Sequence, residues 1–213
     1  MTSHRFWDRQ ARKYAQSPIS DEAAYEYTLE RIGAYLTPEA EVLELGCGTG
    51  STALRLAPQV RAYAASDYAP EMIAIAREKA EAAGAKTLHF RVAGAHEIAP
   101  EGRGWDAVIA LNLLHLLPDP EAAVAHVHGL LKPGGLFISK TFCLPDGRAP
   151  LWLHAMRAAL PVLRVLGKAP AVTFLKVAEL DRATARAGFE ILEAGNYPAN
   201  PPRRFIVARK LDA

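Results

Sequence analysis

The chain has 213 residues, half of them hydrophobic, and a formal net charge of +2. This length and composition suit one α/β domain with a full core, so we treat 1–213 as a single domain. A charge this close to zero leaves no strong nucleic-acid footprint, and the sequence predicts no nucleic-acid partner.

The amino-terminal stretch MTSHRFWDRQARKY is charged and aromatic and has no apolar core of a signal peptide. No apolar run is long enough to span a bilayer. Two cysteines, Cys47 and Cys143, do not make a disulfide framework. These features predict a reducing, cytoplasmic location, and none of them indicates an oligomeric state.

The first half of the chain alternates between predicted helices and strands. Apolar residues three and four apart predict a helix over 21–36, ended by Pro38. Pro70 in the first turn and Gly84 just past the end mark a second helix. In chain order, we predict a helix at 21–36, a buried strand at 41–45, a glycine loop at 46–50 opening a helix, a strand at 61–66 ending at Asp67, a helix at 70–84 and a strand at 87–92.

The same alternation continues and then breaks. We predict a strand at 105–112 buried on both faces, a helix at 119–131 stopped by the KPGG sequence at 132–135, a strand at 136–142, a helix at 178–188 and strands at 189–195 and 204–210. The loop at 196–202 between the last two strands is too short for a helical crossover, so they should pair antiparallel. The predicted fold is therefore α/β, a mostly parallel doubly wound sheet (Rossmann-like) with a carboxy-terminal antiparallel hairpin.

The glycine loop distinguishes between classes of nucleotide ligand. A dinucleotide fold has G-x-G-x-x-G, but Ser51 stands where the third glycine belongs. Glu44, two residues before the first glycine, would repel a pyrophosphate and can accept a hydrogen bond from an ammonium group. Asp67 can accept hydrogen bonds from ribose hydroxyls. The loop therefore favours an adenosine ligand with an amino-acid tail and no phosphate.

The stretches VLELGCGTG, SDYAPEMIAIAREKA, WDAVIALNLLHLLPDP and LLKPGGLFISK stand in family order. Together they resemble the class I S-adenosylmethionine-dependent methyltransferases over about two thirds of the chain. The opening FWDRQARKYA is similar to small-molecule members, including the ubiquinone and menaquinone biosynthesis methyltransferases. The resemblance implies S-adenosylmethionine as the cofactor and a small-molecule methyl acceptor.

The resemblance also implies roles for individual residues. Glu44 and the loop glycines should surround the methionine part, Asp67 the ribose, and Asn112 the junction with the acceptor. Gly94 or Ala95 stands where the family often has an acid for the adenine amino group, so the backbone amides of Ala95 and His96 would serve the adenine instead. The complete set of predicted cofactor-binding residues is Tyr14, Glu44, Gly46, Cys47, Gly48, Gly50, Asp67, Tyr68, Met72, Gly94, Ala95, His96 and Asn112. We interpret the Cys47 thiol in this set as packing.

His115 is the candidate catalytic residue, as a base on the acceptor side; the alternative is a histidine satisfied within a strand-to-helix turn. The histidines and cysteines lack metal-ligand spacing, so no metal site is predicted. Asn200–Arg203 (NPPR) is similar to the NPPY motif of DNA adenine methyltransferases. Its place before the last strand and its final arginine favour a proline-stiffened loop.

We predict a helical flap at 1–38 and a substrate lid at 144–175. Within the lid, Pro161 should split 151–168 into two short helices with an apolar side and a basic side. The alternatives for this segment are an ordinary amphipathic helix pair packed on the sheet, a lid over an apolar substrate, and a peripheral membrane contact.

We therefore predict an enzyme that transfers a methyl group from S-adenosylmethionine to a small apolar or amphiphilic acceptor by in-line displacement. The sequence leaves the acceptor atom open among carbon, oxygen and nitrogen. The alternatives are a non-catalytic S-adenosylmethionine-binding protein and a nicotinamide-dependent oxidoreductase.

Overall fold

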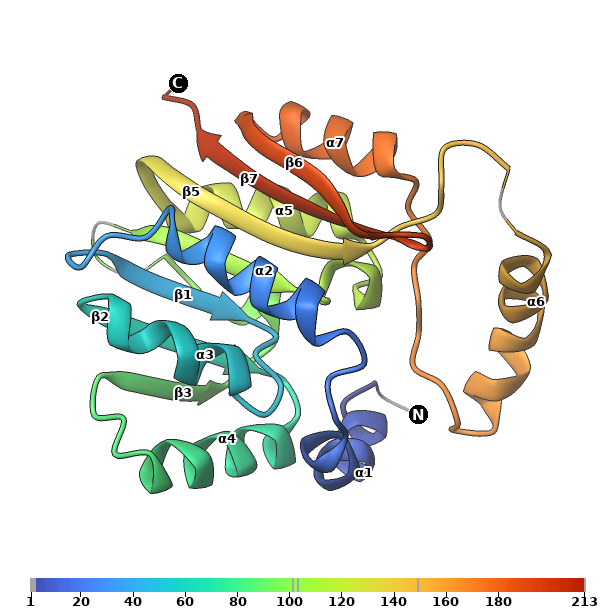
Figure 1. Cartoon of the computed structure of the whole chain (residues 1–213), viewed down its shortest axis with the longest axis horizontal. Helices are drawn as coiled ribbons and strands as arrows, with labels where there is room; N and C mark the ends of the chain where they lie inside the picture. The colour runs from blue at the N-terminus through green and yellow to red at the C-terminus, as the bar shows by residue number, and fades with distance from the viewer. Residues whose placement is uncertain (1–2, 101, 103, 149, 213) are drawn as a thin grey trace.

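Seven strands form one sheet in the order β3-β2-β1-β4-β5-β7-β6 (Figure 1). The computed structural model describes residues 3–100, 102, 104–148 and 150–212. The strands are β1 (Glu41–Leu45), β2 (Ala62–Asp67), β3 (Leu88–Val92), β4 (Trp105–Leu111), β5 (Leu131–Phe142), β6 (Phe189–Ala199) and β7 (Pro202–Lys210). β1 to β5 pair in parallel, whereas β7 pairs antiparallel with both β5 and β6. The predicted mostly parallel sheet with a carboxy-terminal antiparallel hairpin is confirmed.

The helices are α1 (Ser3–Gln16), α2 (Glu22–Gly33), α3 (Ser51–Leu56), α4 (Pro70–Ala82), α5 (Pro120–Leu130), α6 (Leu151–Val165) and α7 (Val177–Arg186), with short 3-10 turns η1 (Ala57–Gln59), η2 (Ala95–Glu97) and η3 (Leu114–Leu116). Local sequence sets their starts. Asp21 and Asp119 cap α2 and α5 by accepting hydrogen bonds from the N–H groups of Ala24 and Ala122. In the part of the chain that the structure describes, no helix combines the length and apolar composition needed to cross a membrane.

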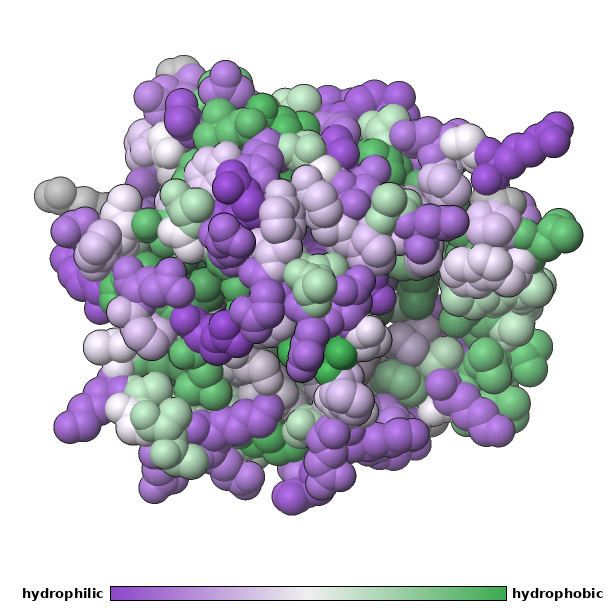
Figure 2. All heavy atoms as spheres, in the orientation of Figure 1, coloured by the Kyte–Doolittle hydropathy of each residue, from purple (hydrophilic) through white to green (hydrophobic). Residues whose placement is uncertain are grey.

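The carboxyl ends of the parallel strands point toward α1 and α6 (Figure 1). α1 packs against α4 through a small cluster that includes Ala11, Ala69 and Met72. α6 stands beyond the sheet at the end of two connecting segments, and hydrophobic side chains gather over it on the face shown in Figure 2. This strand end is where open α/β sheets bind their ligands.

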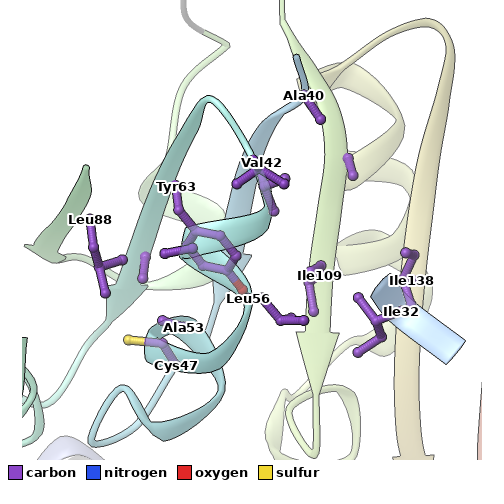
Figure 3. Packing of buried hydrophobic residues seen from close by; sticks show 14 of the residues in the cluster. Ile32, Ala40, Val42, Cys47, Ala53, Leu56, Tyr63, Leu88, Ile109 and Ile138 are labelled. Atoms are coloured by element: carbon purple, nitrogen blue, oxygen red, sulfur yellow. The ribbon is translucent and has the colours of Figure 1, made fainter. Parts of the chain in front are cut away.

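Two hydrophobic cores fill the two faces of the sheet. One lies under α2, α3 and α4 and surrounds the fully buried ring of Tyr63 (Figure 3). The other lies under α5 and α7 and contains Phe137 and Phe189. β4 is buried along most of its length, as predicted for a strand covered on both faces.

Pro161 does not split the segment at 151–168. α6 is one helix with Pro161 in its interior, so the prediction of two short helices is wrong. Proline removes one intrahelical hydrogen bond, which leaves the Arg157 carbonyl without its donor. Arg157 is exposed, so water can satisfy that carbonyl.

Several predicted element ends are also corrected. β5 begins at Leu131, so KPGG lies inside the strand and does not separate it from the preceding helix. Lys132 donates hydrogen bonds to Asp106 on β4 and Glu41 on β1, and these bonds hold the first part of β5 against the sheet. α2 ends at Gly33, short of Leu36, and β6 and β7 take up most of the predicted loop at 196–202. Met1 and Thr2 of the predicted flap and Ala149 of the predicted lid lie outside the described residues.

Candidate active site

The loop between β1 and α3 has a backbone that only glycine accommodates. Gly46 and Gly50 have φ angles of 67° and 74°. A Cβ atom on Gly46 would lie 2.7 Å from Leu113 Cδ1, and one on Gly50 would lie 2.8 Å from Phe90 Cζ. Both glycines are therefore required because the loop at the carboxyl end of β1 packs closely against Leu113 and Phe90.

Glu44 is a buried carboxyl group directly before this loop, with 2% of the residue exposed. The Tyr63 hydroxyl donates a hydrogen bond to Glu44 Oε2 at 2.9 Å. The Glu44 pKa is raised to about 8, because burial and nearby Asp67 raise it more than the Tyr63 hydrogen bond lowers it. A buried acid with no cationic partner among the described residues fits a ligand that brings its own cation, such as the ammonium group of S-adenosylmethionine.

Asp67 ties the end of β2 to the glycine loop. Its Oδ2 accepts a hydrogen bond from the Gly48 N–H at 3.0 Å, and its Oδ1 accepts one from the Ala69 N–H at 2.9 Å. Burial raises the Asp67 pKa, while the backbone N–H groups lower it. Two of the predicted cofactor-binding residues, Gly48 and Asp67, are thus in direct contact.

The predicted adenine-side residues lie on two elements. Met72 is 2% exposed and is buried between α4 and α1. The Gly94 N–H donates a hydrogen bond to Glu97 Oε2 at 2.7 Å. Ala95 and His96 begin η2 and line a narrow apolar crevice that Leu113 and Leu114 also line. Tyr68 follows Asp67 and is partly buried. The contacts of these residues with adenine stay predictions.

Asn112 directly follows β4 and has a left-handed backbone conformation. Its φ of 54° makes it the one non-glycine residue with positive φ in the described parts of the chain. Its N–H donates a hydrogen bond to the Lys140 carbonyl at 2.7 Å, and its Oδ1 accepts one from Arg203 Nη1 at 3.2 Å. These two bonds hold the amide side chain at the ends of β4, β5 and β7.

His115 lies in η3, close to the same strand ends. Burial lowers its pKa to about 4, and the positive charge of Arg203 contributes. Its Nδ1 is buried without a hydrogen-bond partner, and its ring centroid lies 6.0 Å from that of Phe142. The Thr173 N–H donates to the His115 carbonyl at 2.7 Å, which joins η3 to the chain after α6. The lowered pKa keeps the ring neutral near pH 7, and its Nδ1 is enclosed by protein without a hydrogen-bond partner among the described residues.

Tyr14 brings α1 to the glycine loop. Its Cε1 lies 3.8 Å from the position of a Cβ on Gly48, and its ring packs edge-on to Trp7 with a centroid distance of 6.2 Å. Burial raises the Tyr14 pKa, and Tyr25, Asp67 and Glu44 raise it further while Arg203 lowers it. Tyr14 therefore places an aromatic side chain of α1 beside the glycine loop.

The structure brings two cations to this site that sequence analysis did not assign to it. Arg203 belongs to NPPR, which we interpreted as a stiff loop, and Lys140 belongs to a predicted strand. The antiparallel register pairs Arg203 with Phe142 and Lys140 with Phe205, so both are on one face of neighbouring strands. The one sequence signal for the placement of Arg203 at this site is its position at the start of the last strand. In the described ranges, no three His, Cys, Asp or Glu side chains form a metal-binding group.

The fold and the site define a class: an α/β protein of the Rossmann-like methyltransferase type, in which a buried carboxyl group directly precedes a glycine loop. A family model described as "Methyltransferase domain" matches residues 12–194. The chain belongs to this methyltransferase family, and the predictions of a methyltransferase and of S-adenosylmethionine as its cofactor are confirmed.

Individual relatives agree with this assignment. The chain is 32% identical over 209 residues to a ubiquinone biosynthesis O-methyltransferase of Xanthomonas axonopodis pv. citri (strain 306), covering 94% of this chain and 82% of the relative. It resembles the structure of a DhpI–SAH complex with a TM-score of 0.74 at 23% identity, covering 99% and 96% of the two chains. It also resembles geranyl diphosphate methyltransferase in complex with SAM, with a TM-score of 0.73 at 14% identity, covering 87% and 84%.

Proposed function

We propose that this methyltransferase acts on an oxygen atom of an apolar or amphiphilic small molecule. The observation that carries the proposal is the apolar surface of α6 beyond the cofactor-binding strand ends, where Leu151 is 87% exposed and Val165 is 84% exposed. The relative from Xanthomonas supports the choice of oxygen, because it is named as a ubiquinone biosynthesis O-methyltransferase.

Each part of the site has a proposed task. The Glu44 carboxyl group receives the ammonium group of the cofactor, the glycine loop receives its amino-acid tail, and Asp67 receives its ribose. Bound S-adenosylmethionine supplies an electrophilic methyl group, whose bond to sulfur breaks as the acceptor oxygen bonds to the methyl carbon. The chain then has to align the acceptor and exclude water, and alignment can contribute about 7–11 kcal/mol. We propose that the flap (1–38) and the lid (144–175) close over both ligands.

The proposal predicts a dependence on the apolar part of the acceptor. With isotopically labelled S-adenosylmethionine, kcat/KM for 4-octylcatechol should exceed that for catechol by at least about tenfold, since each buried methylene contributes about 0.8 kcal/mol. Methylation at oxygen supports the proposal. Equal values for both acceptors, or transfer only to carbon or nitrogen acceptors, would contradict it. Cofactor binding without transfer to any acceptor would favour the non-catalytic alternative.

We expect His115→Ala to lower kcat by about 100-fold or more if the imidazole accepts the acceptor proton, with little change in S-adenosylmethionine affinity. Because the His115 pKa is lowered to about 4, the ring becomes protonated only in strong acid. The kcat of the wild-type protein should then show no histidine titration near pH 6.5.

The measurement is a pH profile of kcat together with calorimetric cofactor affinity. His89→Ala is the matched control, because His89 is exposed on β3. If His115→Ala lowered cofactor affinity and kcat equally, His115 would be a structural residue of η3.

We also propose that the segment at 151–168 makes a peripheral contact with anionic membranes. Trp152, Val162 and Leu166 are 50%, 62% and 60% exposed. Five basic residues and no acidic residue lie between Asp146 and Glu179, namely Arg148, Arg157, Arg164, Lys168 and Lys176. An exposed apolar helix with basic neighbours is typical of interfacial membrane binding.

The double substitution Leu151→Gln and Val165→Gln should reduce binding to phosphatidylglycerol-containing vesicles by at least about tenfold, because each apolar side chain contributes roughly 1.5–3 kcal/mol when buried. Vesicle flotation measures the binding of wild type and variant to these vesicles. Leu211→Gln, at the far end of the chain and 48% exposed, is the control. Wild-type protein that does not bind anionic vesicles would contradict the proposed membrane contact.

The predicted cytoplasmic location is consistent with Cys47 and Cys143 as separate thiols and stays a proposal.

A further inference from the structure

Arg203 occupies a distinctive place in the fold. It is the second residue of β7, and it pairs with Phe142 at the carboxyl end of β5. Since β7 runs antiparallel, its beginning lies beside the ends of the parallel strands (Figure 1). Arg203 Nη1 reaches Asn112 Oδ1 at the end of β4. The guanidinium is thus at the acceptor side of the site.

The neighbouring arginines on β7 have carboxylate partners. Arg204 donates two hydrogen bonds to Asp181, and Arg209 lies 3.9 Å from Glu190. Arg203 instead contacts the neutral Asn112 amide. In the described ranges no carboxylate lies within ion-pair distance of the Arg203 guanidinium. Arginine is a residue whose fork of N–H donors matches carboxylate and other anionic oxygens.

A second cation supports the same conclusion. Lys140 is 7% exposed, and its Nζ donates hydrogen bonds to Thr28 Oγ1 at 2.7 Å and to the Ala24 carbonyl at 3.2 Å. The Lys140 pKa is lowered to about 8, because burial and the charge of Arg203 lower it more than the charge of Asp21 raises it. Among the described residues, neither Lys140 nor Arg203 has a carboxylate within ion-pair distance.

The two sides of the site thus differ in charge. The predicted cofactor residues Glu44 and Asp67 are acids, whereas Arg203 at the start of β7 and Lys140 near the end of β5 are cations on one face of the sheet. The cofactor is itself cationic at sulfur. A neutral acceptor would leave the positive charges of Arg203 and of the cofactor sulfur without an anion between them.

We propose that Arg203, with Lys140 on the neighbouring strand, binds an anionic oxygen of the methyl acceptor and selects anionic acceptors over neutral ones of the same shape. The anionic oxygen belongs either to a carboxylate or to an ionised phenol. This inference rests on the proposed function in placing a small-molecule acceptor at these strand ends. It makes Arg203 a specificity-determining residue.

Calorimetric binding to the protein saturated with S-adenosylhomocysteine tests the carboxylate source without requiring turnover. The probes are 3,4-dihydroxybenzoate and 3,4-dihydroxybenzamide, which differ in charge and match in shape. A charge-assisted hydrogen bond predicts that wild-type protein prefers the benzoate by about tenfold to hundredfold. For the phenol source the probe is 4-nitrocatechol, whose absorbance reports ionisation. Binding should lower its apparent pKa.

Arg203→Gln should abolish both effects while S-adenosylhomocysteine affinity stays within about threefold, and Arg203→Lys should retain part of them. Arg209→Gln removes the same charge at the other end of β7 and should change neither. Wild-type protein that shows neither effect, including one that binds no probe, would overturn the inference. So would an Arg203→Gln protein that keeps the preference. Methylation of neutral alkyl catechols in either case would leave the proposed function standing.

Discussion

Glu44→Gln is expected to weaken S-adenosylmethionine binding by about tenfold to hundredfold, because it removes a charge-assisted hydrogen bond to the ligand ammonium. The same substitution should stabilise the ligand-free protein at alkaline pH. Glu44 is buried beside Tyr63 and its pKa is raised to about 8 from an ordinary value of 4.5. The folded protein therefore keeps the Glu44 carboxyl group protonated at pH values where the unfolded chain has already lost that proton.

The sign of the stability effect follows from this raised pKa. The stability contribution of protonated Glu44 is fully present below the unfolded pKa of about 4.5 and is lost as the pH rises through about 8. Glutamine does not ionise, so the Glu44→Gln protein should gain stability over wild type as the pH rises from 5 to 8. Urea unfolding across this pH range measures the difference. A constant difference would show that the Glu44 pKa is not raised.

Cofactor binding should also release protons from wild-type protein at pH 7, because an ammonium partner favours the ionised carboxylate. Calorimetry in buffers of different ionisation enthalpy measures the number of protons. The Glu44→Gln protein should release none by this route. Glu41→Gln, at the exposed end of the same strand where Glu41 pairs with Lys132, is the control. Binding of NADH in place of S-adenosylmethionine would contradict the assignment of Glu44.

Gly50→Ala is expected to destabilise the protein by about 2–5 kcal/mol, the sum of about 1–2 for a left-handed residue and about 1–3 for overpacking. The added Cβ would lie 2.8 Å from Phe90 Cζ and 3.0 Å from Ala76 Cβ. Ala76 is fully buried on α4, so its backbone would have to move. The loop would then lose its place beside Asp67, and cofactor affinity should fall with stability.

Gly84→Ala is the matched control for this prediction. Gly84 has a similar φ of 63°, but a Cβ there meets no atom within 4 Å. Gly84→Ala should therefore lower the free energy of unfolding only by the backbone contribution of about 1–2 kcal/mol and leave cofactor affinity unchanged. Chemical unfolding and calorimetric titration measure both quantities. Equal destabilisation of the two variants would mean that the close contact with α4 is not the reason why position 50 requires glycine.

The sequence by itself determined the order of elements and the class of the cofactor. Alternating apolar segments with Pro70 and Gly84 at helix ends predicted a doubly wound sheet, because these signals act over a few residues. The short connection between the last two strands predicted their antiparallel pairing. Glu44 before the glycines predicted a cationic ligand from charge alone. Each of these inferences depends on residues near one another in the chain.

Only the tertiary structure decided how distant residues meet at the acceptor side. Asn112 and Arg203 are 91 positions apart, and strand register brings them into contact. The lowered pKa of His115 depends on burial in η3 and on the charge of Arg203, neither of which its local sequence LLHLL contains. Pro161 is tolerated because its part of α6 is exposed. Burial, register and long-range charge are properties of the folded chain, so a one-dimensional pattern does not encode them in any single segment.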